Sequence, residues 1–206
     1  MEFKDEIILF EEYDDGADYV LKSGNVPVLF TAVHTMMQSF DDGSTKLAEP
    51  FTKAICLYMN KHCNTFSFVK VKDTGIDSNK DNEDDYKKQL FEIISEYNIK
   101  LVIDLHGANR YRDFDVEFGT MNNLSADFST IRELEDAFKE NGITNVIHND
   151  PFKGGAITQS LFSFKDVDVI QLEINRKYRD INNIEYLQML CNSLENFIKQ
   201  YVDYIK

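Results

Sequence analysis

The sequence predicts an α/β fold, a single-domain three-layer α/β/α sandwich whose sheet is mixed but mainly parallel. Short apolar runs that are typical of buried strands alternate along the chain with segments whose apolar residues recur at helical spacing. The run over 100–107 is mostly apolar and ends at a glycine, which is typical of a strand buried on both faces. The 206 residues are 43% hydrophobic, enough for one core, and no linker-like tract or repeat divides them, so we expect one domain over 1–206.

The elements follow from the spacing of apolar residues. Residues 6–22 are predicted to form a strand, an acidic turn and a second strand, because two apolar runs flank that turn. Further strands are predicted where β-branched and apolar residues cluster or alternate, over 27–33, 65–71, 100–107, 114–119, 144–148 and 167–174. Helices are predicted from Glu49, where Pro50 suits a first turn, and over 83–97, 129–141 and 183–204, with a short helix after the turn-rich stretch 149–158. Residues 35–46, 74–82 and 109–113 are predicted to be loops.

The charge balance excludes some partners. The chain has 22 Lys and Arg against 36 Asp and Glu, a net charge of −14, which argues against nucleic acid or an anionic membrane as the main partner. Its three cysteines form no CxxC pair, which is typical of reduced thiols and argues against a thiolate zinc site. No signal-peptide pattern and no apolar run of membrane-spanning length is visible, so we expect a cytoplasmic enzyme.

Three apolar runs each end in a polar functional group: His34, His106 and Glu173. The carboxyl ends of parallel strands meet at one edge of a sheet, so these groups can converge there. Two histidines and a carboxylate form the ligand set of a catalytic zinc site, and either Glu49 or Asp42 could complete it. The spacing alone is not specific, because a histidine beside an acid such as Asp104 can equally be a satisfied core residue.

Several segments together resemble the N-formylglutamate amidohydrolase family, which is related to zinc carboxypeptidases and aspartoacylase-like hydrolases. The resemblance runs from about residue 27 to residue 178 and is most specific in Phe-Lys-Gly-Gly-Ala-Ile-Thr at 152–158 and Gln-Leu-Glu-Ile-Asn-Arg at 171–176. It implies a phosphorylase/hydrolase-like fold. The segment around His34 departs from the family's Pro-His-Ser/Ala-Gly pattern, because here it is Val-His-Thr-Met.

The resemblance implies a zinc-dependent hydrolase that cleaves the C–N amide bond of an N-acyl, N-formyl-like amino acid or a related small acid. Mapped onto this sequence, His34, Glu49 and His106 would bind zinc, with Asp42 as the fallback for the third ligand, and Glu173 would act as general base. An arginine would stabilise the oxyanion or hold a substrate carboxylate, with Arg110, Arg112 and Arg176 as candidates, and Asp104 would orient a ligand histidine. The expected partner is a carboxylate-bearing small molecule, bound by Asn79, Arg112, Lys153, Gly154, Gly155 and Thr158.

Simpler interpretations stay open for several of these residues. Glu49 could cap the following helix, and Asp77 with Asn79 could form only an Asx-turn. Arg110 and Arg112 could be solvated loop charges. For the whole chain, the alternatives are a non-catalytic member of the same fold that binds a small acid or a partner, and a metallo-carboxypeptidase-like peptidase. The sequence leaves the oligomeric state undetermined.

Overall fold

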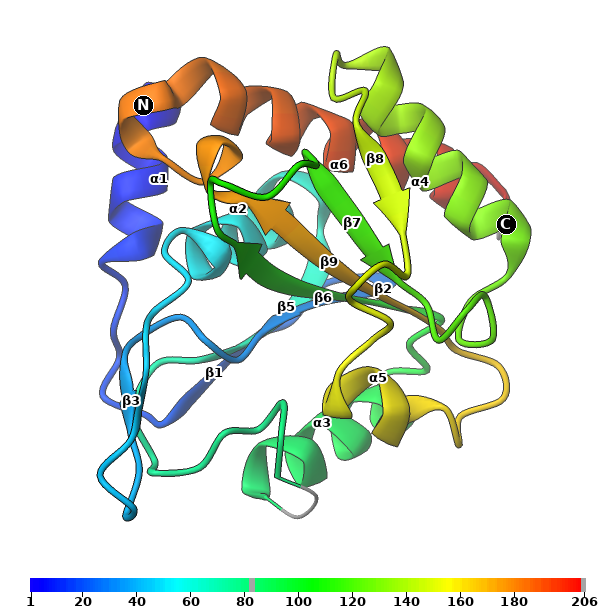
Figure 1. Cartoon of the computed structure of the whole chain (residues 1–206). Coiled ribbons are helices and arrows are strands. Elements are labelled where there is room, and N and C mark those ends of the chain that lie inside the picture. The colour runs from blue at the N-terminus through cyan, green and yellow to red at the C-terminus, as the bar shows by residue number, and fades with distance from the viewer. Residues whose placement is uncertain (82–83, 205–206) are drawn as a thin grey trace.

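A computed structural model describes residues 1–81 and 84–204, and within them a seven-stranded sheet lies between two layers of helices (Figure 1). One face is covered by α1 (Phe3–Glu11), α2 (Thr52–Cys63), α4 (Phe128–Glu140) and α6 (Ile184–Tyr204). The other face carries α3 (Asp85–Glu96) and the short α5 (Ala156–Leu161). The predicted three-layer α/β/α sandwich is therefore confirmed.

The sheet is mixed and mainly parallel, as predicted. Its strand order is β1 (Tyr19–Lys22), β5 (Thr65–Lys70), β2 (Val26–Ala32), β6 (Leu101–Ala108), β9 (Asp168–Asn175), β7 (Val116–Gly119) and β8 (Val146–His148). The central strands β5, β2, β6 and β9 run parallel, while β1 pairs antiparallel with β5 and β7 pairs antiparallel with β9. The carboxyl ends of β2, β6 and β9 therefore open onto the same edge of the sheet.

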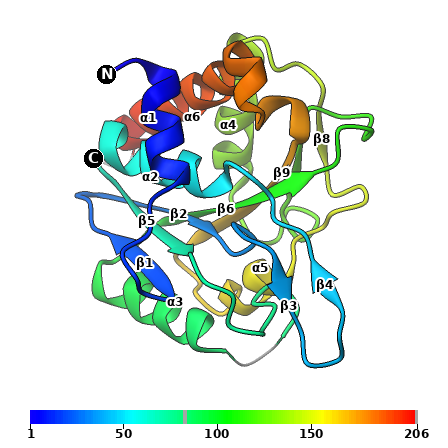
Figure 2. The same ribbon diagram turned by 90° about the vertical axis from the view of Figure 1, so that its left-hand side faces the viewer.

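Two predicted segments differ from the structure. The first strand of 6–22 is instead helix α1, because Phe3, Ile7 and Phe10 share one helical face that packs into the core while Leu9 is exposed. The predicted loop 35–46 contains a small hairpin, β3 (Gln38–Ser39) and β4 (Thr45–Lys46), which projects from the body of the molecule (Figure 2). The predicted boundary between the 74–82 loop and the 83–97 helix falls at residues 82 and 83, outside the described residues. Near the end of the chain, two short 3₁₀ turns, Arg176–Tyr178 and Ile181–Asn183, precede α6.

The two faces of the central strands differ in polarity toward their carboxyl ends. On β6, Leu101, Ile103 and Leu105 point into the larger core beneath α1, α2, α4 and α6. Val102 points to the opposite face, where it belongs to the smaller core around α3 and α5. Asp104 and His106 follow on that same face and are in register with Gln171 and Glu173 of β9. A buried polar row therefore replaces the apolar core at this end of the sheet.

The N-terminus of α2 is capped by a carboxylate from α1. Glu11 accepts hydrogen bonds from the backbone N–H groups of Phe51, at 2.8 Å, and Ala54, at 3.4 Å. Replacing Glu11 with alanine leaves these donors unpaired and is expected to lower the free energy of unfolding by about 1–3 kcal/mol, measured by urea denaturation. Replacing the exposed neighbour Glu12 with alanine should change it by less than about 0.5 kcal/mol. Equal effects of the two substitutions would contradict the assignment of the cap to Glu11.

Within the described residues, no helix combines the length and the apolar character needed to cross a membrane.

Candidate metal centre and active site

Three predicted ligands, distant in sequence, meet at the carboxyl edge of the sheet. The Nδ1 atoms of His34 and His106 are 3.2 Å apart. Oε1 of Glu49 lies 3.1 Å from Nδ1 of His34, and Oε2 lies 3.2 Å from Nδ1 of His106. His34 follows β2, His106 lies on β6, and the backbone N–H of Glu49 donates to the carbonyl of His34, which draws the two loop residues together. The side chains of His34 and His106 are 2% exposed, and that of Glu49 is 11% exposed.

The outer nitrogen of each histidine faces a carboxylate. Nε2 of His34 lies 2.8 Å from Oδ1 of Asp77, and Nε2 of His106 lies 3.1 Å from Oδ2 of Asp104. A carboxylate on one ring nitrogen favours a proton there and leaves the other nitrogen as a lone-pair donor. The two Nδ1 atoms that converge on Glu49 are therefore the ones prepared to bind a metal.

This donor set fits a divalent metal. Ligand atoms 2.0–2.1 Å from a tetrahedral zinc lie about 3.3 Å from one another. The two Nδ1 atoms, 3.2 Å apart, are close to this edge length, and each has one carboxylate oxygen of Glu49 within 3.1–3.2 Å. Four carboxylates, those of Glu49, Asp77, Asp104 and Glu173, surround the two imidazoles in a largely buried site. Such a concentration of negative charge favours a cation among them.

The pKa values of the group reflect this crowding in the metal-free protein. Burial by itself lowers the pKa of His106, but the carboxylates of Asp104 and Glu49 outweigh it and hold that pKa well above its usual value. Burial raises the pKa of the Glu49 carboxyl, but the two histidines outweigh it and hold that pKa well below its usual range. Without a metal, the imidazole of His106 therefore holds a proton that a bound metal would have to displace.

These contacts show where the candidate acids of the ligand loops lie. The side chain of Glu49 points to the histidines, while Glu11 caps the following helix in its place. Asp42 lies exposed in the turn of the β3–β4 hairpin and binds Ser44, so the structure does not bring this fallback ligand to the site. Asp77 does form the expected Asx-turn, accepting from the N–H of Asn79 at 3.0 Å, but it also holds His34, a contact that the loop sequence gave no means of predicting.

Glu173 lies beside His106 in the neighbouring strand. The two residues are in register across β6 and β9, and the Nε2 of Gln171 donates to Oε1 of Glu173 at 2.9 Å. Burial raises the pKa of Glu173; His106 opposes this shift, and the carboxylate of Glu49 adds to it. A carboxylate whose pKa is shifted toward neutrality is suited to accept and then release a proton.

Gln171 connects Glu173 to the loop that precedes α5, and Glu117 binds the same loop; the sequence analysis missed both roles. Oε1 of Gln171 accepts from the N–H of Gly155, and Oε1 of Glu117 accepts from the N–H of Phe152, both at 2.6 Å. Glu117 is in register with Glu173 on the antiparallel strand β7 and is fully buried. The alternation of polar and apolar residues in 116–118 and 171–174 was the available signal, because it places these side chains on one face.

A two-lobed cleft opens beside the metal candidates. The hairpin lobe, of about 750 Å³, is lined by residues 45–50, Gly107, 109–111, Arg176 and Arg179. The loop lobe, of about 580 Å³, is lined by Lys46, Glu49, Asn79, 106–109, Arg112, 151–155, Gln171 and Glu173. Lys46 and Glu49 line both lobes, and Nζ of Lys46 lies 3.4 Å from Oε1 of Glu49.

The three predicted arginines all line this cleft, but in different ways. Arg110 lies in the hairpin lobe, where its Nη2 is 3.5 Å from Oδ2 of Asp180 and its side chain is 57% exposed. Arg176 lines the same lobe, and its buried Nη1 has no hydrogen-bond partner among the described residues. Arg112 lies in the loop lobe, with its guanidinium 5.0 Å from the ring centre of Phe152.

The predicted substrate-binding loop is only partly brought to the cleft. Lys153, Gly154 and Gly155 line the loop lobe together with Asn79, whose side chain also accepts from the N–H of Ile157 at 3.3 Å. Thr158 does not line the cleft: it is fully buried and packs against Gly154, so its predicted substrate contact is not supported. Its place in the first turn of α5, facing inward, accounts for this difference.

A buried arginine that the sequence analysis did not single out supports the floor of the cleft. Arg179 donates to the carbonyls of Ile174, Pro50 and Ala108 at 3.0, 2.7 and 3.2 Å, and burial lowers its pKa to about 10. Gly107 leaves room for this guanidinium, because a Cβ at residue 107 would overlap it.

Replacing Gly107 with alanine is therefore expected to displace Arg179 and to lower the free energy of unfolding by about 2–3 kcal/mol in urea denaturation. Gly107 is not among the glycines with positive φ, so backbone strain does not contribute to this effect. An unchanged denaturation midpoint would contradict this role of Arg179.

Comparisons with known proteins agree with this architecture. Residues 84–178 match the sequence model of the N-formylglutamate amidohydrolase family. Among solved structures, gene product Atu2144 from Agrobacterium tumefaciens superimposes with a TM-score of 0.66 at 15% identity, covering 93% of this chain and 96% of that chain. The N-formylglutamate amidohydrolase from Ralstonia eutropha JMP134 gives 0.64 at 13% identity, over 91% of this chain and 98% of that one. A bacteriophage poly-gamma-glutamate hydrolase gives 0.57 at 14% identity, over 96% and 94%. No curated protein sequence matches the chain.

The family match confirms the resemblance predicted from the sequence. The matched segment contains His106, Lys153 and Glu173, whereas His34 and Glu49 precede it. At 13–15% identity the solved structures establish the fold. The family match supports a hydrolase of the N-formylglutamate amidohydrolase kind, and the chemistry has to be argued from the site.

Proposed function

We propose that this protein is a zinc-dependent amidohydrolase that cleaves the C–N amide bond of an N-acyl amino acid or a related small acid. His34, Glu49 and His106 would hold the metal through two Nδ1 atoms and one carboxylate. When bound at such a site, zinc lowers the pKa of a bound water to about 7 and polarises the scissile carbonyl. The single observation that carries the proposal is the convergence of these three donors, with an acid on the outer nitrogen of each histidine.

The remaining steps belong to residues of the chain. Glu173 would take a proton from the attacking water and pass it to the leaving nitrogen, and its raised pKa suits both halves of this transfer. Gln171 would hold Oε1 of Glu173, and Asp77 and Asp104 would keep the histidines oriented. A guanidinium at the cleft, from Arg110, Arg112 or Arg176, would stabilise the oxyanion or a substrate carboxylate.

The direct test combines elemental analysis with a hydrolysis screen. Protein purified without chelator is expected to contain one zinc per chain. It should also release free amino acid from at least one of the N-formyl, N-acetyl and N-succinyl amino acids. Metal-free protein that stays inactive on all of them after zinc is added would instead favour a non-catalytic binding protein. Preferential cleavage of unblocked peptides would favour the metallo-carboxypeptidase-like alternative.

The affinity for zinc is expected to depend steeply on pH. The raised pKa of His106 means that the metal-free protein holds a proton there, and metal binding must release it. Below that pKa, each unit decrease in pH should weaken the apparent zinc affinity about tenfold for the one proton released. Competition titrations with a chromogenic chelator between pH 6 and 8 measure this slope. An affinity that does not change over that range would show that His106 carries no proton in the metal-free site.

A further inference from the structure

We infer that the substrate carries an anionic group on each side of the scissile C–N bond, so that both the acyl half and the amine half are held by cationic side chains. This inference deepens the hydrolase function proposed above and rests on it. The observation that carries it is the form of the cleft, in which two lobes meet at Glu49 and each lobe is lined by cations.

The charge of the cleft is opposite to that of the whole protein. The chain has 36 acidic residues against 22 basic ones, so a random patch of surface would be acidic. Among the described residues that line the lobes, the acidic ones are Glu49 and Glu173, both assigned above to the reaction itself. The cationic ones are Lys46, Arg110, Arg112, Lys153, Arg176 and Arg179. A concave cationic surface on an acidic protein concentrates and orients anionic ligands.

The hairpin lobe contains two guanidinium groups that can bind an anionic ligand. Arg110 pairs with Asp180 at 3.5 Å, but its side chain is 57% exposed, and exposed ion pairs of this kind are weak and easily exchanged. Arg176 has a buried Nη1 that lacks a partner among the described residues. A buried donor without an acceptor is costly, and a carboxylate in this lobe would satisfy it.

The loop lobe contains a second, separate cationic pair. Arg112 is stacked on Phe152, which restricts the guanidinium without using its N–H donors. Lys153 follows directly in the chain and lines the same lobe. Arg112 and Lys153 line the loop lobe and not the hairpin lobe, whereas Arg110 and Arg176 line the hairpin lobe and not the loop lobe. Each lobe therefore has its own candidates for binding an anion.

The sizes of the lobes favour an acyl group larger than one carbon. Each lobe, at about 750 and 580 Å³, lies within the range that by itself accommodates a small-molecule ligand. A formyl group would leave one cationic lobe without a ligand. An amide that joins two acid-bearing units, such as a dicarboxylic acyl group on an acidic amino acid, would fill both.

The experiment compares amides of matched size in the zinc-loaded protein. N-succinylglutamate carries charge on both halves, N-succinamoylglutamate is nearly isosteric but neutral on the acyl half, and N-succinylglutamic diamide is neutral on the amine half. We expect kcat/KM for the first to exceed that for either of the others about tenfold at low salt. These ratios should shrink at 0.5 M salt, because screening weakens exposed charge interactions. A ratio near one at either end would overturn the two-sided assignment while leaving the hydrolase function in place.

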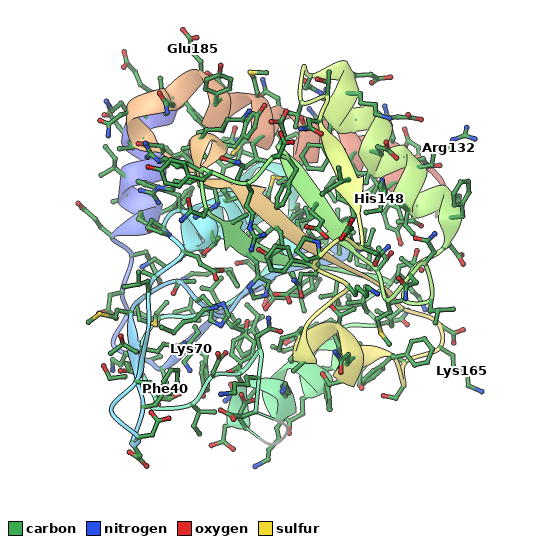
Figure 3. All side chains as sticks on the ribbon, viewed as in Figure 1. Phe40, Lys70, Arg132, His148, Lys165 and Glu185 are labelled. Carbon is green, nitrogen blue, oxygen red and sulfur yellow. The ribbon has the colours of Figure 1, made fainter. Side chains whose placement is uncertain are left out.

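Variants locate the two ends. The quantity compared is kcat/KM of N-succinylglutamate divided by that of the analogue that is neutral at one end. Arg110→Gln or Arg176→Gln should reduce this ratio for one end of the substrate, and Arg112→Gln or Lys153→Met should reduce it for the other end. Arg132→Gln and Lys165→Met are matched controls, because both side chains are exposed and point away from the body of the molecule (Figure 3). The controls should leave both ratios as in the unmodified protein. If variants of both lobes reduce the ratio for the same end of the substrate, the proposal is overturned.

A binding measurement keeps the inference testable if no amide is hydrolysed, an outcome that would refute the proposed function separately. Calorimetry on the zinc-loaded protein would then compare the same three compounds as ligands. Binding of N-succinylglutamate about tenfold tighter than that of each neutral analogue supports recognition at both ends. Equal affinities would overturn it.

Discussion

Replacement of Glu173 with glutamine is expected to reduce kcat by about 10²–10⁴-fold while zinc content stays at one per chain. Glutamine has nearly the same shape and can still meet Gln171, but it cannot accept the proton of the attacking water. Because Glu173 is not one of the three converging donors, metal binding should survive its replacement. Steady-state kinetics on the best N-acyl amino acid, together with elemental analysis, measures both quantities.

The matched control for this substitution is Glu185→Gln. Glu185 is exposed at the start of α6 and points away from the molecule, as Figure 3 shows. It should change neither kcat nor zinc content. Full activity of Glu173→Gln would remove Glu173 from the mechanism, whereas loss of zinc in this variant would indicate that it is a ligand.

Replacement of His106 with asparagine is expected to weaken zinc binding by more than 100-fold and to abolish hydrolysis. The substitution removes one of three donors, which should exceed the 10–100-fold effect typical of a residue that only orients a ligand. Asp104→Asn tests that lesser effect directly, because Asp104 contacts only the outer nitrogen of His106. Zinc affinity is measured by chelator competition at pH 7.5.

Thermal denaturation separates loss of the metal from loss of the fold. A metal that binds only the folded state raises the melting temperature, so zinc should stabilise the unmodified protein and leave His106→Asn unaffected. His148→Asn serves as the control, because His148 lies on β8 and pairs with Glu135 rather than with the site. Stabilisation of His106→Asn by zinc to the same extent as the unmodified protein would place the metal elsewhere.

Much of the fold could be predicted because its signals are local. The strands that became β2, β5, β6 and β9 are runs that are buried or that alternate, and their burial is visible in the residues themselves. Residues 7–10 are predicted to lie in a strand but form part of helix α1, because four consecutive apolar residues suit either element. Its choice depends on packing against α2, which lies some 40 residues further along the chain.

The candidate site shows the same division. His34, Glu49, His106 and Glu173 could be named because they end apolar runs or fit family motifs. The sequence does not show the contacts of four further residues, because each forms a hydrogen bond with a residue of a different element. These residues are Asp77, Gln171, Glu117 and Arg179. The choice between Glu49 and Asp42 was open for the same reason, since nothing in the hairpin sequence shows which acid turns inward.

The α/β class, the polar ends of three central strands and the resemblance to an amidohydrolase family are visible in the order of the residues, because they depend on residue type and on the two-residue period of a strand. Folding was needed to show which acid lies against the two histidines, which nitrogen of each histidine faces it, and how the cations divide between the two lobes. Hydrogen bonds and cavities form between elements that are far apart along the chain and meet only after it folds.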